Sequence, residues 1–318
     1  MVNKLPLLKN ADMPLTIETY EGSGQACHPD ILKFRDGFKG GLSRPYTHIM
    51  AMTPYPEGWD FHENPSVVVS NNPTKEFIKD NIPNPLSPQG TNYHADTDLV
   101  YHNGVFHLFY LQNFFKDPHR VKTSRDLVNW SAEKTIRGVS LLSPAIIFDE
   151  HENRWKMWGV EHDTWKVKYY ESKDDLIWRL TGHANIPELL FCDCWGDWRE
   201  RNCWHLDIQK TRLSGEYIAL ITYANGSQGY GPCMLFYGES PDGLSWDVPR
   251  KPILIPTEKG WDRDFGIYRS TFIVEENLLK VWYSAANKSN NVWSWGIGYA
   301  EAEVGFEPTD TTLNVISS

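Results

Sequence analysis

Short apolar segments that open with polar residues at two alternate positions recur five times along the chain. These openings are His28-Pro-Asp30, Asp96-Thr-Asp98, Ser143-Pro-Ala145, His205-Leu-Asp207 and Arg269-Ser-Thr271. Each continues into strand-like residues, as Ile31-Leu-Lys-Phe34 does after the first opening. Residues i and i+2 of a strand point to the same face, so each polar pair is expected to face one way. Regular recurrence at this spacing is typical of propellers and solenoids.

A five-bladed β-propeller places the first strand of each blade around a central axis, so the alternate residues would form two stacked rings. We expect an outer ring of His28, Asp96, Ser143, His205 and Arg269. We expect an inner ring of Asp30, Asp98, Ala145, Asp207 and Thr271. The funnel that these rings surround is the expected place for chemistry.

A turn motif supports the same fold. Ser-x-Asp is followed by a Trp six residues after the Ser in Ser124–Trp130, Ser172–Trp178 and Ser240–Trp246. The Asp suits a tight turn because its side chain can bond its own backbone two residues on, and the Trp can bury a large apolar area. With no long helical periodicity, the chain is predicted to be all-β. We predict one domain over 1–318, a five-bladed propeller of four-stranded antiparallel blades. The predicted blades are approximately 20–85, 90–137, 140–185, 203–256 and 264–305.

Charge and composition argue against several classes of protein. The net charge of -10 at pH 7 argues against nucleic-acid partners, and no apolar stretch approaches the roughly 18 residues of a membrane span. The apolar part of the N-terminal segment is too short for a secretory signal, and five Cys is an odd number for a disulfide framework. These features favour a cytoplasmic protein, or release by a non-classical or phage route. The oligomeric state stays open.

The strand openings and the turn motif resemble those of the five-bladed propeller glycoside hydrolases, the furanosidase-like superfamily that includes families 32, 43, 62, 68 and 117. The resemblance covers roughly residues 20–305. Family 43 proteins open blades one and three with Asp-Pro-Ser and place a catalytic Glu at the start of blade four. Here these places read His28-Pro-Asp30, Ser143-Pro-Ala145 and Trp204-His205-Leu-Asp207, so the chain diverges at its catalytic motifs. Asp96 resembles the transition-state-stabilising Asp of family 32.

Glycoside hydrolysis usually needs a carboxylic acid and a second carboxylate that acts as base or nucleophile. The resemblance implies Asp30 as base or nucleophile, because it lies one ring from the family's position for that role. Asp207 on blade four is the expected acid, Glu161 is the alternative acid, and Asp96 or Asp98 would orient the substrate. Asp30 and Asp207 come from blades two apart in the ring, which favours the wider carboxylate spacing of an inverting enzyme.

Other residues are candidates for binding a furanose-containing or anionic carbohydrate. His28, His205 and Arg269, with Ser143 in the same ring, would either bind an anionic sugar or pair with the neighbouring Asp residues. The aromatic and acidic wall residues are Glu63, Trp59, Trp195 and Trp204. No cofactor is expected to be required, although the resemblance implies a structural divalent cation such as calcium on the axis. A non-catalytic glycan-binding propeller and a phosphorylase remain as alternative functions.

Overall fold

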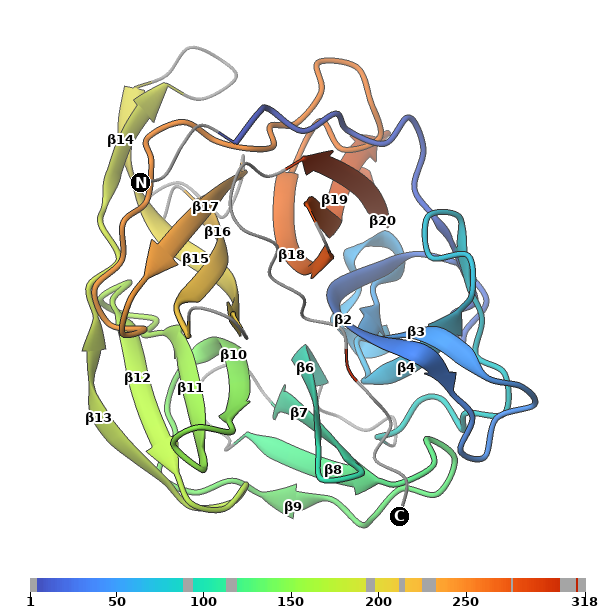
Figure 1. The fold of residues 1–318 in the computed structure, drawn as a ribbon. Helices are drawn as coiled ribbons and strands as arrows, with labels where there is room; N and C mark the ends of the chain where they lie inside the picture. Colours follow the sequence, from blue (N-terminus) through green and yellow to red (C-terminus); the bar gives the residue numbers. More distant parts are fainter. Residues whose placement is uncertain are drawn as a thin grey trace.

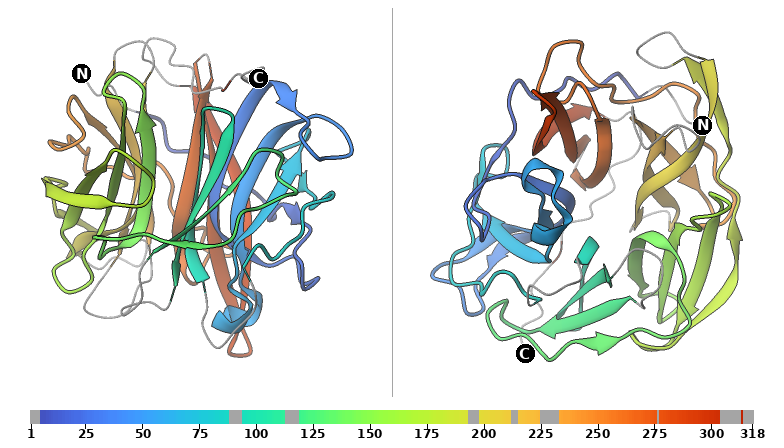
Figure 2. Two further views of the ribbon diagram at one scale, coloured as in Figure 1. Left: turned by 90° about the horizontal axis from the view of Figure 1, so that it is seen from below. Right: turned by 180° about the vertical axis from the view of Figure 1, so that it is seen from behind.

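Five antiparallel sheets surround a central axis in the computed structural model (Figure 1). The structure describes residues 5–87, 94–112, 119–192, 198–211, 215–224, 233–275, 277–303 and 313. In side view the sheets stand roughly upright around the central axis (Figure 2). The predicted all-β propeller is confirmed.

One strand from each sheet faces the axis. The inner strands are β2 (Ala26–Phe38), β6 (His94–His102), β10 (Leu142–Asp149), β15 (Trp198–Lys210) and β18 (Gly266–Glu275). Each contacts the inner strand of the next blade, and β18 contacts β2, which closes the ring. The five repeated sequence openings all lie on these strands.

The remaining strands extend each blade outward. They are β3 (Tyr46–Pro54) and β4 (Ser66–Ser70) in blade one; β7 (Val105–Gln112), β8 (Arg120–Ser124) and β9 (Lys134–Thr135) in blade two; β11 (Arg154–Val160), β12 (Val167–Ser172) and β13 (Trp178–Ala184) in blade three; β14 (Leu189–Cys192), β16 (Tyr217–Ala224) and β17 (Met234–Ser240) in blade four; and β19 (Leu278–Ser289) and β20 (Val292–Glu303) in blade five. All pairings within these blades are antiparallel.

Blades one and five have three strands in their described sheets, whereas four were predicted. In blade one an isolated bridge from Val69 to Ile78 takes the outer position. Beyond it, β5 (Glu76–Phe77) pairs in parallel with β1 (Thr16–Ile17). In blade five the N-terminal segment takes the outer edge, because the Leu15 N–H donates to the Ile297 carbonyl. This segment therefore joins the first and last blades.

The stretch between the predicted third and fourth blades, 186–202, contains a strand that the predicted blade bounds left out. This strand, β14, pairs with the start of β15, with Leu189 opposite Arg201. The short apolar run Leu189-Leu-Phe191 is the sequence feature that favours this added strand. Blade four thereby reaches four strands.

The predicted Ser-x-Asp turns are confirmed. In the blade-four turn, Asp242 Oδ1 accepts hydrogen bonds from the backbone N–H groups of Leu244 and Ser245, at 2.8 and 2.7 Å. The indole N–H of Trp246 donates to the Gly243 carbonyl at 3.0 Å, which fixes the ring over the turn. Asp126 and Asp174 make the equivalent backbone contacts in blades two and three.

Replacing Asp242 by Ala is expected to lower the free energy of unfolding by about 1–2 kcal/mol, because two backbone donors lose their partner. Urea unfolding followed by Trp fluorescence measures this effect. A loss below about 0.3 kcal/mol would show that water satisfies the turn equally well.

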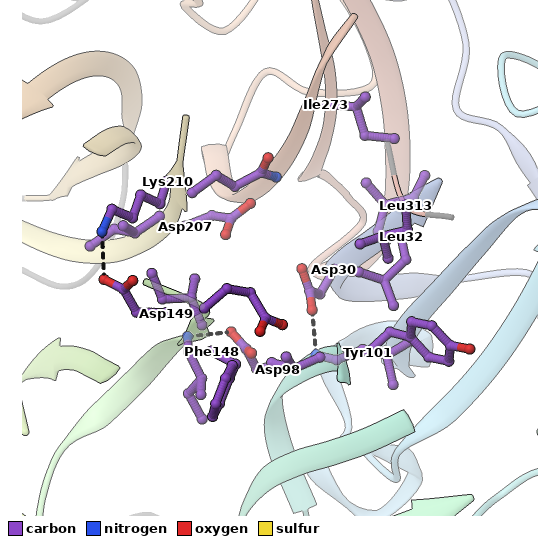
Figure 3. A pocket seen from close by; sticks show the side chains of 18 of the residues that line it. Asp30, Leu32, Asp98, Tyr101, Phe148, Asp149, Asp207, Lys210, Ile273 and Leu313 are labelled. Atoms are coloured by element: carbon purple, nitrogen blue, oxygen red, sulfur yellow. Dashed lines mark hydrogen bonds and ion pairs between the residues drawn. The ribbon is translucent and has the colours of Figure 1, made fainter. Parts of the chain in front are cut away.

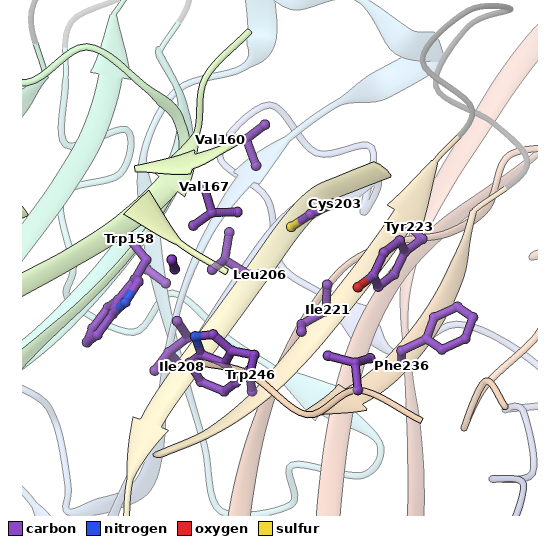
Figure 4. Close-up of a cluster of buried hydrophobic side chains, with 14 of the residues drawn as sticks. Trp158, Val160, Val167, Cys203, Leu206, Ile208, Ile221, Tyr223, Phe236 and Trp246 are labelled. Carbon is purple, nitrogen blue, oxygen red and sulfur yellow. The ribbon is translucent and has the colours of Figure 1, made fainter. Parts of the chain in front are cut away.

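Large side chains fill the spaces between neighbouring blades. Between blades three and four, Trp158, Ile208, Ile221 and Trp246 belong to one buried cluster (Figure 4). Apolar burial of this kind contributes roughly 25 cal/mol per Å². The clusters hold the inner strands in place around the axis. Among the described residues, no helix has the length and hydropathy to cross a membrane.

Candidate active site

A β-bulge interrupts every inner strand at the same place. The register shifts lie between Cys27 and Asp30, Ala95 and Asp98, Leu142 and Ala145, Cys203 and His205, and Ile267 and Ser270. In the first three blades the outer-ring residue has left-handed backbone, with φ of 51° at His28, 52° at Asp96 and 52° at Ser143. The expectation of regular alternation is therefore wrong locally. Bulges re-aim side chains next to functional sites, and here they turn the outer ring toward the axis.

Three outer-ring side chains and the backbone of the fourth, Ser143, converge on Asp96. Its Oδ1 lies 3.3 Å from His28 Nε2, 4.0 Å from His205 Nδ1 and 3.6 Å from Arg269 Nη1. Its Oδ2 accepts a hydrogen bond from the Ser143 backbone N–H at 2.9 Å. All five side chains are buried. The predicted outer ring therefore forms a single cluster, built from all five blades.

His28, Asp96 and His205 meet the geometric requirement for a metal site. One ligand atom from each residue lies within 4.8 Å of the others. The Ser143 hydroxyl lies 2.5 Å from His205 Nδ1, whereas His205 Nε2 is buried without a hydrogen-bond partner among the described residues. A buried ring nitrogen without a partner is costly unless another group binds it.

Glu63 completes the cluster from the blade-one loop. The loop contains two 3₁₀ turns, η1 (Pro56–Gly58) and η2 (Asp60–His62). Glu63 Oε1 lies 3.2 Å from His28 Nδ1, and the Thr53 hydroxyl lies 2.9 Å from the same nitrogen. The two oxygens orient His28 so that Nε2 faces Asp96. Such partners on the second nitrogen are typical of metal-binding histidines.

Burial and neighbouring charges shift the pKa values of the side chains in the cluster. Burial lowers the pKa of His28, but Cys27, Glu63 and Asp96 outweigh it and raise this pKa well above its usual range. Burial raises the pKa of Asp96, yet His28, His205 and Arg269 bring it below normal. Burial lowers the pKa of His205 well below its usual range. The Asp96 carboxylate thus lies between the His28 imidazole and the Arg269 guanidinium. A metal held at His28 Nε2 would take the place of the proton on that nitrogen.

The guanidinium of Arg269 makes its contacts within the protein. The side chain is buried, its Nη2 donates to the Pro144 carbonyl at 2.9 Å, and the same atom lies 3.8 Å from Asp98 Oδ2. With its contact to Asp96, the guanidinium links the two rings. Of the two roles left open by the sequence, the geometry favours pairing with carboxylates.

The inner ring holds the blades together. Asp30 accepts a hydrogen bond from the Leu99 N–H, Asp98 from the Ile146 N–H at 3.2 Å, and Asp207 from the Phe272 N–H at 3.3 Å. Thr271 accepts one from the Ile31 N–H at 3.2 Å. In each case the donor is the residue after the inner-ring position of the next blade. Ala145 is the exception, because it has no polar side chain.

These same carboxylates line a cavity of about 750 Å³, shown in Figure 3. Asp30, Asp98 and Asp207 lie at one end of it, and residues that follow them along the inner strands form its walls. The cavity thus lies on the opposite side of the inner ring from the His28 cluster. Burial, then the charge of Asp30, raises the pKa of Asp207 to about 7. Burial and Asp30 also raise the pKa of Asp98 well above normal.

Of the other predicted residues, Trp204 lies beside the cluster, whereas Glu161 and Trp59 have other surroundings. Glu161 pairs with Lys168 at 2.6 Å, and this contact lowers its pKa, which is the opposite of what a general acid needs. Trp204 stands beside His205 with ring centroids 5.3 Å apart, and Trp59 is exposed on the blade-one loop. Trp195 lies outside the described residues.

Tyr268, which the sequence suggested only as part of an aromatic wall over 261–268, joins the cluster. The centroid of its ring lies 4.2 Å from that of His205 and 5.6 Å from that of His28. Tyr268 directly precedes Arg269 of the outer ring, as Trp204 directly precedes His205 of the outer ring. This shared position is the sequence feature that could have placed Tyr268 at the site.

No model of a known protein family matches the chain. A curated protein of Flavonifractor plautii, the A type blood N-acetyl-alpha-D-galactosamine deacetylase, is 25% identical over 329 aligned residues. These cover 84% of this chain and 41% of that protein, so the chain spans less than half the length of this relative.

Solved structures show the same architecture. The crystal structure of an N-acetylgalactosamine deacetylase from F. plautii, in complex with blood group B trisaccharide, has a TM-score of 0.79 at 22% identity, covering 93% of this chain and 96% of that one. A β-xylosidase has a TM-score of 0.55 at 12% identity, covering 91% and 96%. The chain therefore has the propeller fold that these solved structures share.

Proposed function

We propose that this protein is a metal-dependent carbohydrate deacetylase, which hydrolyses the N-acetyl group of an amino sugar. The observation that carries the proposal is the cluster of His28, Asp96 and His205, with the Glu63 carboxylate beside it. The similarity to an N-acetylgalactosamine deacetylase supports the same reaction. The proposal revises the expectation that no cofactor is required.

Two imidazoles and one carboxylate are ligands that suit a divalent transition metal. A metal held there would polarise the amide carbonyl and lower the pKa of water. His28 and Asp96 would present Nε2 and Oδ1 to it. Ser143 and Glu63 would orient the two imidazoles through their Nδ1 atoms. Calcium, the structural cation implied by the resemblance, prefers oxygen ligands and fits this set less well.

In the proposed reaction, Glu63 is the group that moves protons. Burial raises its pKa, so its basicity is closer to that needed near neutral pH. In the proposed reaction Glu63 takes a proton from the attacking water while the new C–O bond forms. It then returns that proton to the sugar nitrogen as the C–N bond breaks. The products are acetic acid and the free amine, which exchange a proton to give acetate and a protonated amino sugar, so atoms and charge balance without a further reactant.

Glycosidic bond cleavage is the second candidate. The raised pKa of Asp207 and the cavity lined by Asp30, Asp98 and Asp207 favour it. It ranks second because each of these carboxylates already accepts an inter-blade backbone hydrogen bond.

Replacing Glu63 by Gln is expected to reduce acetate release at least about 100-fold, because Gln keeps the shape and cannot exchange the proton. The matched variant Asp207→Asn removes an inner-ring carboxylate in the same way. Both are assayed for acetate and for new reducing ends on N-acetylated glycans. Acetate release that survives in Glu63→Gln contradicts the proposal. Reducing-end release that is lost only in Asp207→Asn would place glycosidic cleavage first.

A further inference from the structure

The cavity beside the inner ring continues the repeat of the inner strands. Pairing is regular beyond the bulges, so side chains two residues after the inner-ring positions face the same way. These side chains form a third ring of Leu32, Val100, Ile147, Gln209 and Ile273, and all five line the cavity of about 750 Å³. Gln209, the polar member of the third ring, donates its amide N–H to the Phe272 carbonyl. The inner-ring carboxylates are therefore followed by a mostly aliphatic lining.

The third ring also gives the cavity its depth. Since a strand rises about 3.3 Å per residue, the third ring lies about 7 Å beyond the carboxylates, the length of about six carbons in an extended chain. Leu313 adds to the same wall, because its N–H donates to the Lys33 carbonyl at 2.7 Å and its carbonyl accepts from the Arg35 N–H at 3.0 Å. A cavity of this size, with apolar walls and a few polar groups, is typical of sites for small ligands.

The carboxyl groups of Asp30, Asp98 and Asp207, which border one space in Figure 3, have too little positive charge beside them. Arg269 Nη2 lies 3.8 Å from Asp98 Oδ2, but Nη1 of the same guanidinium lies 3.6 Å from Asp96. Among the described residues, no cationic side chain forms an ion pair with Asp30 or Asp207. Buried carboxylates without a cation are costly, and burial raises the pKa of all three acids.

Lys33 and Lys210 also line the cavity, but they do not supply the missing charge. Lys33 pairs with Glu275, and Lys210 Nζ lies 2.7 Å from Asp149 Oδ2. Each ammonium group therefore has a carboxylate of its own outside the inner ring. The inner ring keeps an excess of negative charge that a cationic ligand would balance.

The spacing of the acids indicates which kind of cation fits. In the described part of the chain, three ligand atoms within 4.8 Å of one another occur at the His28 cluster, and the inner-ring acids form no such group. Metal ions bind oxygen at about 2.0–2.6 Å, whereas an ammonium N–H reaches a carboxylate oxygen at about 2.7–2.9 Å. Asp98 and Asp207 use Oδ2 for the inter-blade hydrogen bonds, which leaves the second oxygen of each for a ligand. The wider arrangement favours an ammonium group over a metal ion.

We propose that this cavity binds an aliphatic ammonium compound, a primary amine on a chain of about six carbons or more. Its ammonium group would donate hydrogen bonds to the inner-ring carboxylates, and its chain would lie along the third ring and Leu313. The site lies on the opposite side of the inner ring from the His28 cluster, so the proposal is independent of the proposed function.

Binding of n-hexylamine, a cation at pH 7, tests the proposal without any turnover. The amine is titrated into the wild type and followed by calorimetry and by NMR of the isoleucine, leucine and valine methyl groups. Hexanol and hexanoate are the matched ligands, with the same chain length and no positive charge. The amine should bind at least about tenfold more tightly than either, because it alone can donate charge-assisted hydrogen bonds to the carboxylates. The largest shifts should be those of Val100, Ile147 and Ile273.

Asp207→Asn should weaken amine binding about tenfold, because it removes one charge and keeps an oxygen for the Phe272 N–H. Asp242→Asn, the same change in an exposed turn, is the matched control and should bind the amine as the wild type does. If Asp207→Asn unfolds, the methyl shifts of the wild type decide the location, and shifts confined to residues outside the cavity overturn the proposal.

Three further results would also overturn the site. They are no amine binding by the wild type, equal affinities for hexylamine and hexanol, and a folded Asp207→Asn variant that binds the amine as tightly as the wild type. Displacement of the amine by Ca²⁺ or Mg²⁺, with the same methyl shifts, would assign the cavity to an inorganic cation instead.

Discussion

Replacing Asp96 by Asn is expected to reduce acetate release at least about 100-fold and to remove bound divalent metal. Asp96 is the one carboxylate shared by His28, His205 and Arg269, and its Asn replacement cannot supply a negative charge to a metal. Loss of a residue that only orients a metal ligand already costs 10–100-fold, so loss of a ligand should cost no less. Metal content by mass spectrometry and acetate release by NMR measure both effects.

The matched control is Asp242→Asn, the same chemical change in a surface turn, which should keep full metal content and activity. A strong chelator should inhibit the wild type, and added Zn²⁺ or Mn²⁺ should restore it. An Asp96→Asn variant with normal metal content and normal acetate release would show that the cluster is only structural.

Replacing Asp149 by Asn is expected to destabilise the protein by about 3 kcal/mol, because it leaves a buried Lys156 without its full charge partner. Asp149 lies 2.9 Å from Lys156 Nζ and 2.7 Å from Lys210 Nζ, and it accepts a hydrogen bond from the Tyr217 hydroxyl at 3.0 Å. These contacts join blades three and four. Glu152 also pairs with Lys156, which keeps the expected loss near the lower end of the range for broken buried pairs.

The same network predicts how stability depends on pH. Burial raises the pKa of Asp149, but hydrogen bonds from Lys210, Lys156 and Tyr217 outweigh it and hold this pKa below its ordinary value of 3.8. Because the folded-state pKa is depressed, the contribution is present above about pH 4 and is lost as the pH falls further. Urea unfolding should show a large effect of Asp149→Asn at pH 7 and a smaller one at pH 3. The exposed neighbour variant Glu150→Gln should change stability by less than about 0.5 kcal/mol, and an equal loss in both variants would refute the account.

The propeller fold could be predicted because the same pattern of polar and apolar residues recurs five times along the sequence. Polar residues at the start of five apolar segments located the inner strands and both rings, and the Ser-x-Asp turns located outer strands. The bulges could not be predicted, because left-handed backbone at His28, Asp96 and Ser143 leaves no mark in a pattern of apolar and polar residues. The strand β14 was missed because its apolar run is only three residues long.

The members of the candidate site were predicted, but their roles were not. His28, Asp96 and His205 were placed in one ring, yet the resemblance to glycoside hydrolases directed attention to two carboxylates. Sequence spacing does not show that Asp96 reaches both imidazoles, because His28 and His205 come from blades one and four. The inner-ring carboxylates differ in another way: their backbone hydrogen bonds, which cross from blade to blade, exist only in the folded ring.

The most direct test is to incubate the wild type with an N-acetylated oligosaccharide and to follow free acetate and new reducing ends in the same sample by NMR. The deacetylase account predicts acetate and an equal amount of free amino sugar, with the glycosidic bonds intact and the reaction stopped by a chelator. New reducing ends without acetate would contradict it and would assign the chemistry to the carboxylates of the inner ring.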